Sequence, residues 1–333
     1  MKSIILILFL ASAILCSVGD TLPEFQACLQ KCPPCSSPGI FWSCEAQCNY
    51  QCQQYITDQR ERSGLEVVQF YGKWPFVKVF GIQEFFSTIF SLGNFYVNYR
   101  NFFKIHRQYR KSDGEYRIMY FQYLLLLGVS CIGWGFSTIF HLRDTAKTET
   151  LDYFGAFAIM LVNLNAIFVR YFELYKKLGL LRLWWFSLMI VFIYHCNRLL
   201  TNWDYSYNMK TNIATGIFTM VLWILHSLST LRKYNKNYLV YNNSIQLLPF
   251  ETKLLNKLNY ISIAKSKLIP LIPISNNLFL LCGLSLEVKD FPPIARLIDA
   301  HSLWHLVTIF PSIIWFDWNI WDIEMSKIVT TPK

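Results

Sequence analysis

The fold of this chain is decided by the stretch Tyr120–Phe140, "YFQYLLLLGVSCIGWGFSTIF", which carries no formal charge. About 20 apolar residues are enough for an α-helix to cross the hydrocarbon core of a bilayer. The stretch is followed at once by His141, and Ser137 stands one helical turn before that histidine. A histidine in lipid is costly and is usually turned toward protein or water. The sequence therefore predicts a membrane-spanning helix that ends in a polar site.

The rest of the chain has the composition of a protein whose solvent is mostly lipid. Of its 333 residues, 53% are hydrophobic and 16% are charged, whereas a soluble domain has about 25% charged residues. We therefore predict an all-α polytopic membrane protein. We attribute the net charge of +10 to basic loops that orient the chain in the membrane. We therefore expect no nucleic-acid partner. The apolar runs predict a seven-transmembrane helix bundle with spans near residues 76–98, 118–140, 151–170, 180–200, 211–231, 268–287 and 301–321.

The basic loops set the expected orientation of this bundle. Lys and Arg gather after the first, third and fifth spans, for example between Arg100 and Arg117 and again within residues 232–267. Because positive charge stays on the cytoplasmic side, we expect a lumenal N-terminus, a cytoplasmic insertion at 232–267 and a cytoplasmic tail at 322–333. The glycosylation sequon at Asn242 falls in that insertion and should remain unmodified.

Residues 1–19 have the pattern of a secretory signal peptide. Lys2 precedes an apolar run, and small residues lead to an expected cleavage after Gly19. An uncleaved signal anchor is the alternative, although the apolar run is short for a spanning helix. Cleavage leaves a lumenal domain at 20–75 in front of the membrane domain at 76–321.

The lumenal domain contains a dense group of cysteines. Behind a signal peptide, an even number of cysteines in a short segment predicts disulfides in an oxidising lumen. Two of the spacings are CxxxC, which puts thiols on one face of a helix. We therefore expect a small helical hairpin closed by three bridges of undetermined pairing, with a zinc cluster as the alternative. The six residues are Cys28, Cys32, Cys35, Cys44, Cys48 and Cys52.

Several polar side chains are expected at one depth on the lumenal side. His141 ends the second span, Asp152 begins the third, and "DAHSLWH" at the start of the seventh contains His301 and His305. Histidines at i and i+4 share one face of a helix. Three histidines with an open position are typical of a catalytic zinc site. We therefore predict a Zn²⁺ ion held by His141, His301 and His305.

Two neighbouring residues suggest hydrolysis. Zinc-bound water becomes a nucleophile near neutral pH, Ser137 is placed to hydrogen-bond that water or the developing oxyanion, and Asp152 to take its proton. Each residue alone has a simpler explanation, such as a serine bonded to a backbone carbonyl or an aspartate that caps a helix. Four further polar residues are candidates for the surroundings of the site, the first of them expected inside the first span: Glu84, Asp144, His195 and Asp299.

Several motifs resemble one family of membrane proteins. They are "FYGKWPF" from Phe70, "STIFHLRD" ending at Asp144, "EVKDFPP" from Glu287, and "DAHSLWH" from Asp299. With the cysteine-rich head, they resemble the post-GPI-attachment-to-proteins factor 3 family, also called Per1-like, over nearly all of the chain after the signal peptide. This family is similar to the seven-span hydrolases that include alkaline ceramidases and adiponectin-type receptors. The pattern of that superfamily falls on Ser137, His141, Asp152, His301 and His305.

The resemblance implies a lipid-remodelling enzyme of the endoplasmic reticulum or Golgi membrane. Such a GPI-specific phospholipase A2 removes the sn-2 fatty acid from the phosphatidylinositol of GPI-anchored proteins, which are then the partners together with membrane lipids. A catalytically inactive, zinc-containing receptor or assembly factor is one alternative. Such a protein would need the three histidines but not Ser137 and Asp152. A ceramidase-like amide hydrolase is another, although the acidic N-terminal calcium loop of that branch is not visible in the sequence.

Overall fold

A computed structural model describes residues 17–33, 42–237, 249, 252–260 and 266–330. Within these ranges the regular elements are helices, with three isolated β-bridges beside them, and the all-α prediction is confirmed. Most of the expected signal peptide, Cys35 and the Asn242 sequon lie outside the described residues. The helices are η1 (Val18–Thr21), α2 (Pro23–Gln30), α3 (Cys44–Arg62), α4 (Phe85–Lys111), α5 (Gly114–Leu142), α6 (Ala146–Tyr171), η2 (Leu174–Lys176), α7 (Leu178–Thr201), α8 (Tyr205–Lys236), α10 (Lys253–Tyr260), η5 (Ser266–Leu271), α11 (Ile272–Lys289) and α12 (Ala300–Thr330).

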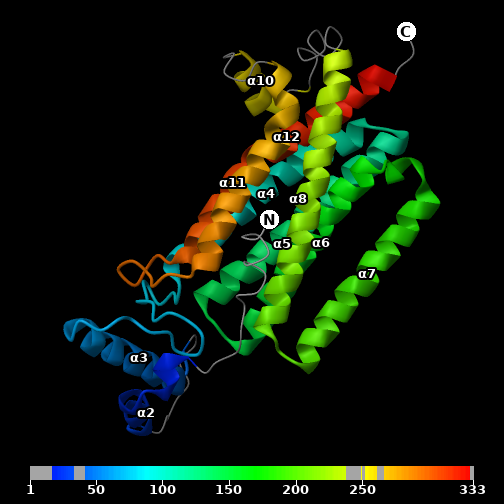
Figure 1. Cartoon of the computed structure of the whole chain (residues 1–333). Coiled ribbons are helices and arrows are strands. Elements are labelled where there is room, and N and C mark those ends of the chain that lie inside the picture. The colour runs from blue at the N-terminus through cyan, green and yellow to red at the C-terminus, as the bar shows by residue number, and fades with distance from the viewer. Residues whose placement is uncertain (1–16, 34–41, 238–248, 250–251, 261–265, 331–333) are drawn as a thin grey trace, which may run out of the picture.

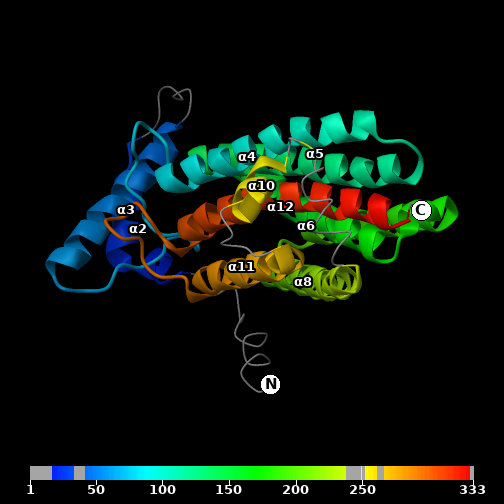
Figure 2. The same cartoon turned by 90° about the horizontal axis from the view of Figure 1, so that it is seen from above.

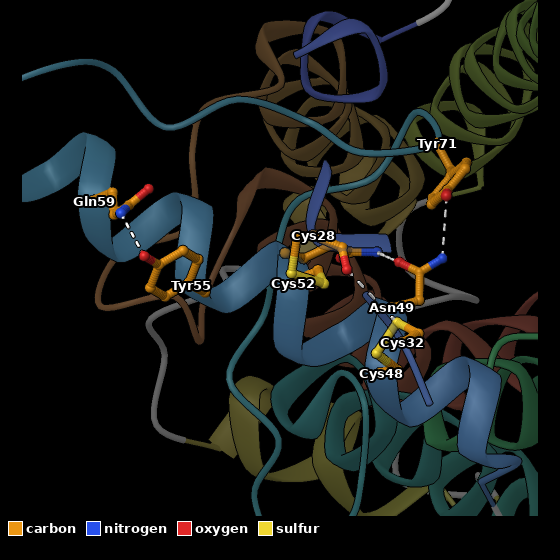
Figure 3. The surroundings of a disulfide bond; sticks show 9 residues. Cys28, Cys32, Cys48, Asn49, Cys52, Tyr55, Gln59 and Tyr71 are labelled. Atoms are coloured by element: carbon orange, nitrogen blue, oxygen red, sulfur yellow. Dashed lines mark hydrogen bonds between the residues drawn. A yellow bond between two sulfur atoms is a disulfide. The ribbon is translucent and has the colours of Figure 1, made fainter. Parts of the chain in front are cut away.

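The N-terminal head, residues 17–75, is a helical hairpin fastened by disulfides. The α2 segment is joined to α3 by two neighbouring disulfide bonds, Cys28–Cys52 and Cys32–Cys48 (Figure 3). The prediction of disulfides is confirmed for these four cysteines, and the zinc-cluster alternative is wrong for them. The third expected bridge includes Cys35, which the structure does not describe, and it stays a prediction.

The hairpin encloses a small apolar core. Phe25 of α2, Ile56 of α3 and Phe70 of the following linker are each at most 1% exposed. Helix α3 begins where the Ser43 side chain accepts a hydrogen bond from the backbone N–H of Ala46. A unit this small buries little apolar surface, so its covalent crosslinks are expected to supply much of its stability.

Two tight turns carry the chain from the head into the bundle. Each turn is closed by an isolated β-bridge and contains a glycine with positive φ. The backbone N–H groups of Gln83 and Glu84 then donate to the carbonyl oxygens of Leu142 and His141. Because these residues pair with the end of α5, the first helix of the bundle begins only at Phe85. The expectation of a helix from about residue 76, with Glu84 inside it, is corrected.

Among the described residues, five helices are long and apolar enough to cross a membrane. They are α5, α6, α7, α8 and the segment Leu268–Lys289 that contains α11. Helices α4 and α12, which were also expected to span, run beside these five (Figure 1), and α4 is the more polar of the two. Helix α12 continues to Thr330, so the segment expected to be a tail from residue 322 is helical over most of its length.

Helix α12 lies in the middle of the bundle (Figure 2). It packs between α4 and α11, and hydrogen bonds from Tyr120, Arg170 and His226 connect it to α5, α6 and α8. Trp318 and Trp321 in its second half are at most 1% exposed. Helix α7 lies outside this group and packs mainly on α6 (Figure 1). Its buried residues are Leu181, His195 and Leu199.

Helix α4 presents a buried polar stripe to α12. The side-chain amides of Asn94 and Asn101 donate to the backbone carbonyls of His305 and Ser312, at 2.7 and 2.9 Å. Between helices in lipid, association depends on close packing and on such hydrogen bonds. The stripe lowers the hydropathy of α4 and attaches it to the central helix. Its polar members are Ser87, Thr88, Ser91, Asn94, Asn98, Asn101 and Gln108.

At the end of the bundle away from the head, a charged cluster surrounds α12. The Asp322 carboxylate lies 2.6 Å from Arg170 Nε of α6 and 3.0 Å from His226 Nε2 of α8. Buried charges are tolerated when they are paired in this way. His226 therefore belongs to a structural ion-pair cluster, separate from the histidines at the other end.

The head docks on the loop that precedes α12. Arg296 in that loop lies 2.6 Å from the Asp58 carboxylate of α3 and also pairs with Glu61. The backbone N–H of Val77 donates to the carbonyl of Arg296 at 3.0 Å. The head and the start of the central helix are therefore joined through one arginine.

Candidate metal site

Three histidines converge at the head end of the bundle, where α5 ends and α12 begins. His141 is in the last turn of α5, and His301 and His305 are in the first two turns of α12. The imidazole centres lie 5.2 Å (His141 to His301), 4.9 Å (His141 to His305) and 4.4 Å (His301 to His305) apart. One nitrogen of each ring lies within 4.8 Å of the other two. The structure thus brings together the three residues expected to bind zinc.

Local hydrogen bonds fix the helix ends that carry these rings. At the start of α12, Asp299 Oδ1 accepts the Ser302 N–H at 2.8 Å, and the Asp299 N–H donates to Ser302 Oγ at 3.0 Å. This reciprocal cap satisfies backbone donors that a helix start otherwise leaves unpaired. The turn that carries His301 is therefore held in place from its first residue.

Two of the histidines are held by carboxylates. The Nδ1 atom of His141 lies 2.7 Å from Glu84 Oε2, and Nδ1 of His301 lies 2.9 Å from Glu287 Oε2. A carboxylate that accepts the Nδ1–H bond fixes the tautomer in which Nε2 carries the free lone pair. Both rings therefore keep Nε2 as the atom for a ligand.

The third histidine is held by a serine, which also connects it to Ser137. His305 Nδ1 lies 2.8 Å from Ser91 Oγ, and Ser91 Oγ lies 3.2 Å from Ser137 Oγ. Ser91 is fully buried and Ser137 nearly so. The two hydroxyls form a short chain beside the histidine cluster, between α4, α5 and α12.

The donor set fits a zinc ion. The Nε2 atom of His141 is buried and has no hydrogen-bond partner among the described residues. Buried polar atoms are nearly always bonded to something, and a metal ion supplies what this nitrogen lacks. Zinc is commonly held by three neutral imidazoles with one open position. The carboxylates of Glu84 and Glu287, placed behind two of the rings, offset the charge of the ion in the protein interior.

Asp152 faces the same cluster from α6. It lies in the second turn of that helix, and its nearest polar and charged neighbours include Ser137, His141 and His301. As a residue, Asp152 is only partly buried. The serine and the aspartate that were expected to accompany the metal therefore lie next to the histidines.

The four candidates for the surroundings of the site occupy different places. Glu84 contacts a histidine directly, and Asp299 caps the helix that carries His301. Asp144 instead forms an ion pair with Lys73 of the linker. His195 stacks on Phe157, with ring centres 3.8 Å apart, between α7 and α6. No contact between His195 and the three histidines is found in the described part of the chain.

Sequence reasoning missed two residues of the site, Ser91 and Glu287. Ser91 lies two helical turns after Glu84, on the buried polar face of α4, so the repeat of polar residues at helical spacing was the signal for it. Glu287 was visible as part of "EVKDFPP". Nothing in its spacing relates it to His301, because the loop between α11 and α12 determines that contact.

A cationic rim accompanies the site on the side of the head. The Trp42 ring is flanked by Lys78 Nζ at 2.9 Å and by the Arg143 guanidinium carbon at 3.9 Å. Burial and the charge of Arg143 lower the pKa of Lys78 to about 7. Although burial opposes it, the carboxylates of Asp144 and Glu149 raise the pKa of Lys73. The charge of Lys73 is therefore balanced by carboxylates, whereas Lys78 loses its proton more readily than an ordinary lysine.

Comparisons with known proteins identify the family of the chain. The Per1-like family model matches residues 34–323. The chain is 34% identical to Protein PER1 of Saccharomyces cerevisiae, over 92% of each chain. It is 31% identical to Post-GPI attachment to proteins factor 3 of Drosophila melanogaster, over 93% of this chain and 90% of that one. It is 30% identical to GPI-specific phospholipase A2-like PGAP3 of Xenopus laevis, over 91% and 89%. No solved structure matches the chain significantly.

Proposed function

The chain belongs to the Per1-like family, and from that premise we propose that it hydrolyses the sn-2 acyl ester of the phosphatidylinositol in GPI anchors. The reaction is that of a metal-dependent phospholipase A2. The names of two relatives, Post-GPI attachment to proteins factor 3 and GPI-specific phospholipase A2-like PGAP3, support a role in GPI-anchor processing and a phospholipase A2 reaction. GPI-anchored proteins are the substrates.

The observation that carries this proposal is the meeting of Ser137 and Asp152 with the three histidines. A purely structural zinc site needs only its ligands, whereas ester hydrolysis also needs a hydrogen-bond donor for the oxyanion and an acceptor for the proton of the attacking water. A hydroxyl and a carboxylate from two different helices lie beside this cluster.

The residues then have distinct tasks. His141, His301 and His305 would hold a zinc ion, which would supply Lewis-acid chemistry and a water nucleophile near neutral pH. The Asp152 carboxylate accepts the proton of the attacking water, and the Ser137 hydroxyl donates a hydrogen bond to the carbonyl oxygen as negative charge develops on it. Ser91 orients the Ser137 hydroxyl, because it lies between that hydroxyl and His305 Nδ1.

The membrane arrangement follows from the same proposal. Helices α4 and α12 complete a set of seven spans, because they run beside five apolar helices and bury their polar residues against each other. The histidine end faces the lumen of the endoplasmic reticulum or Golgi, where GPI anchors reside, and the basic end faces the cytoplasm. The acyl ester of a lumenal lipid then lies near the depth of the histidines.

The test is release of the sn-2 fatty acid from a GPI lipid by purified protein, with bound metal counted in the same preparation. His141→Ala, His301→Ala and His305→Ala should lose zinc and activity together. Ser137→Ala should keep about one zinc per chain and lose about 10²–10³ in rate, the usual value of one oxyanion donor. Asp152→Asn should also keep zinc and lose about 10²–10⁴, the usual value of a positioned general base.

Three outcomes would contradict the proposal. Full activity in both Ser137→Ala and Asp152→Asn would make the two residues structural. Absence of a transition metal from active wild-type protein would remove the role of the histidines. Hydrolysis of a ceramide, with no fatty acid released from the GPI lipid, would show that the protein is an amide hydrolase.

A further inference from the structure

A cavity at the basic end of the bundle lies far from the histidines. It has a volume of about 330 Å³ and is lined by residues of α4, of the first turns of α5, and of α7. Helix α5 begins beside this cavity and ends at His141. Its 29 residues correspond to about 40 Å of helix. The cavity therefore has no part in the hydrolytic site.

Two arginines without acidic partners line the cavity. Arg117 of α5 and Arg182 of α7 are exposed, and in the described ranges no carboxylate oxygen lies within ion-pair distance of either guanidinium. Arg117 lies over the ring of Tyr109, 4.7 Å from its centre. By contrast, Arg170 and Arg296 are each bonded to carboxylates. This pair of cations is therefore available to an external anion.

The remaining lining is apolar and aromatic. Leu178 is 49% exposed and Phe121 is 41% exposed, while Leu181 forms the buried floor. Trp185 and Tyr109 also line the cavity. Tyr and Trp are typical of the depth at which a membrane meets water. A site that combines cations with an apolar wall at this depth suits an amphipathic anion better than a soluble one.

Two helix starts add to the positive potential of the cavity. Gly114 and Leu178, the first residues of α5 and α7, both line it, and neither helix start has a side-chain cap. The N–H groups of the first turn of a helix lack partners within the helix and favour negative charge. These N–H groups therefore add to the attraction that the two arginines exert on an anion.

We infer that this cavity binds one anionic phospholipid of the leaflet at the basic end. The lipid phosphate lies between Arg117 and Arg182, and an acyl chain lies against Leu178, Phe121 and Trp185. The position of α7 supports this inference, because α7 has few buried residues and packs mainly on α6. A lipid held between α5 and α7 strengthens the attachment of this outer helix to α5, to which Trp185 Nε1 already donates a hydrogen bond at Gln122 Oε1.

The experiment is native mass spectrometry of the full chain, purified in micelles that contain phosphatidylserine. One phosphatidylserine should be retained per wild-type chain, and phosphatidylcholine should not be retained in a parallel preparation. The double variant Arg117→Gln/Arg182→Gln should bind phosphatidylserine about 30-fold more weakly, as expected when two basic side chains near an anionic lipid are removed. Leu178→Trp keeps both arginines but fills the cavity, and it should also lose the lipid.

The matched control is Arg232→Gln/Lys236→Gln at the same end of α8. It removes the same charge from exposed positions that do not line the cavity, so it should retain the lipid as the wild type does. Unchanged retention in the Arg117/Arg182 variant, or equal retention of phosphatidylcholine, would overturn the inference. The inference would also be overturned if millimolar inorganic phosphate displaced phosphatidylserine and Leu178→Trp had no effect. The ligand of the cavity would then be a soluble anion.

Discussion

At the scale of single residues, the partner behind each imidazole determines how the histidines can act. Glu84 and Glu287 hold two of the rings through Nδ1, and Ser91 holds the third. Partners of this kind fix the tautomer and the orientation of a ring, and they raise its basicity as a ligand. The arrangement therefore has two anionic partners and one neutral partner around one candidate metal ion.

Glu84→Gln and Glu287→Gln should weaken zinc binding more than they change the chemical step. Loss of such a partner typically costs about 10–100-fold in metal affinity or activity. We expect that much loss of affinity in competition with a chromophoric chelator, with most of the turnover restored at saturating zinc. Asp144→Asn is the control, because its carboxylate pairs with Lys73 and contacts no histidine. Wild-type zinc affinity in both glutamine variants would show that the carboxylates do not support the metal.

The convergence of the three histidines with Asp152 could be predicted from the sequence for a physical reason. A polar residue at the end of an apolar run is costly there, and loop charges place the ends of several spans on the same side. This reasoning found His141, Asp152, His301 and His305. It did not find Glu287, because the contact of Glu287 with His301 depends on the path of an irregular loop, which has no periodicity.

At the scale of helices, the contact between α5 and α6 determines how close Asp152 comes to Ser137. Gly133 of α5 and Gly155 of α6 meet at this contact, and a Cβ atom on Gly155 would lie 3.0 Å from the Cα atom of Gly133. Small residues allow helix backbones to approach closely in membranes. Because the obstructing atom belongs to the backbone, a side chain at this position must push the helices apart.

Gly155→Ala should therefore lower both stability and turnover. Overpacking of a well-packed contact costs about 1–3 kcal/mol, measurable as a lower midpoint of thermal unfolding in detergent. Turnover should fall further than stability explains, because Asp152 moves away from Ser137. Gly128→Ala in α5 is the control, since no atom lies within 4 Å of its added Cβ. Equal effects of the two variants would argue against a special contact at Gly155.

The helices themselves were largely predictable, and their ends were less so. Long apolar runs identified α5 to α8 because burial in lipid requires about 20 apolar residues. The start of α4 was placed too early, because "FVKVFGIQ" (Phe76–Gln83) is apolar enough for a helix. In the structure this segment forms a turn, and the N–H groups of Gln83 and Glu84 bond to the end of α5.

At the scale of the whole molecule, the two ends of the bundle differ in character. The histidine end carries the disulfide-bonded head, and the other end carries the ion pairs of Asp322 and the arginine-lined cavity. Because positive charge favours the cytoplasmic side, we expect the histidine end in the lumen and the other end in the cytoplasm. The same orientation predicts a cytoplasmic location for Asn242.

Asn242 should therefore carry no glycan in cells. The sequon lies outside the described residues, but α8 ends before it and α11 begins after it at the basic end of the bundle. A mobility shift assay with a glycosidase should show no change in the wild type. The double variant Ser63→Asn/Leu65→Thr creates a sequon at exposed positions of the head and should be modified. A glycosidase-sensitive shift in the wild type that disappears in Asn242→Gln would reverse the orientation and the placement of the site.

The ion pairs between Arg296 and α3 have a consequence for biosynthesis. The ribosome delivers the head first and α12 last, and N-terminal units generally fold before later ones are made. His301 and His305 follow the arginine that docks on the head, so the histidine cluster is complete only after the final helix joins a head that is already oxidised. A chain that is released before α12 is made lacks two of the three histidines. If the proposed function holds, the activity therefore appears only at the end of synthesis.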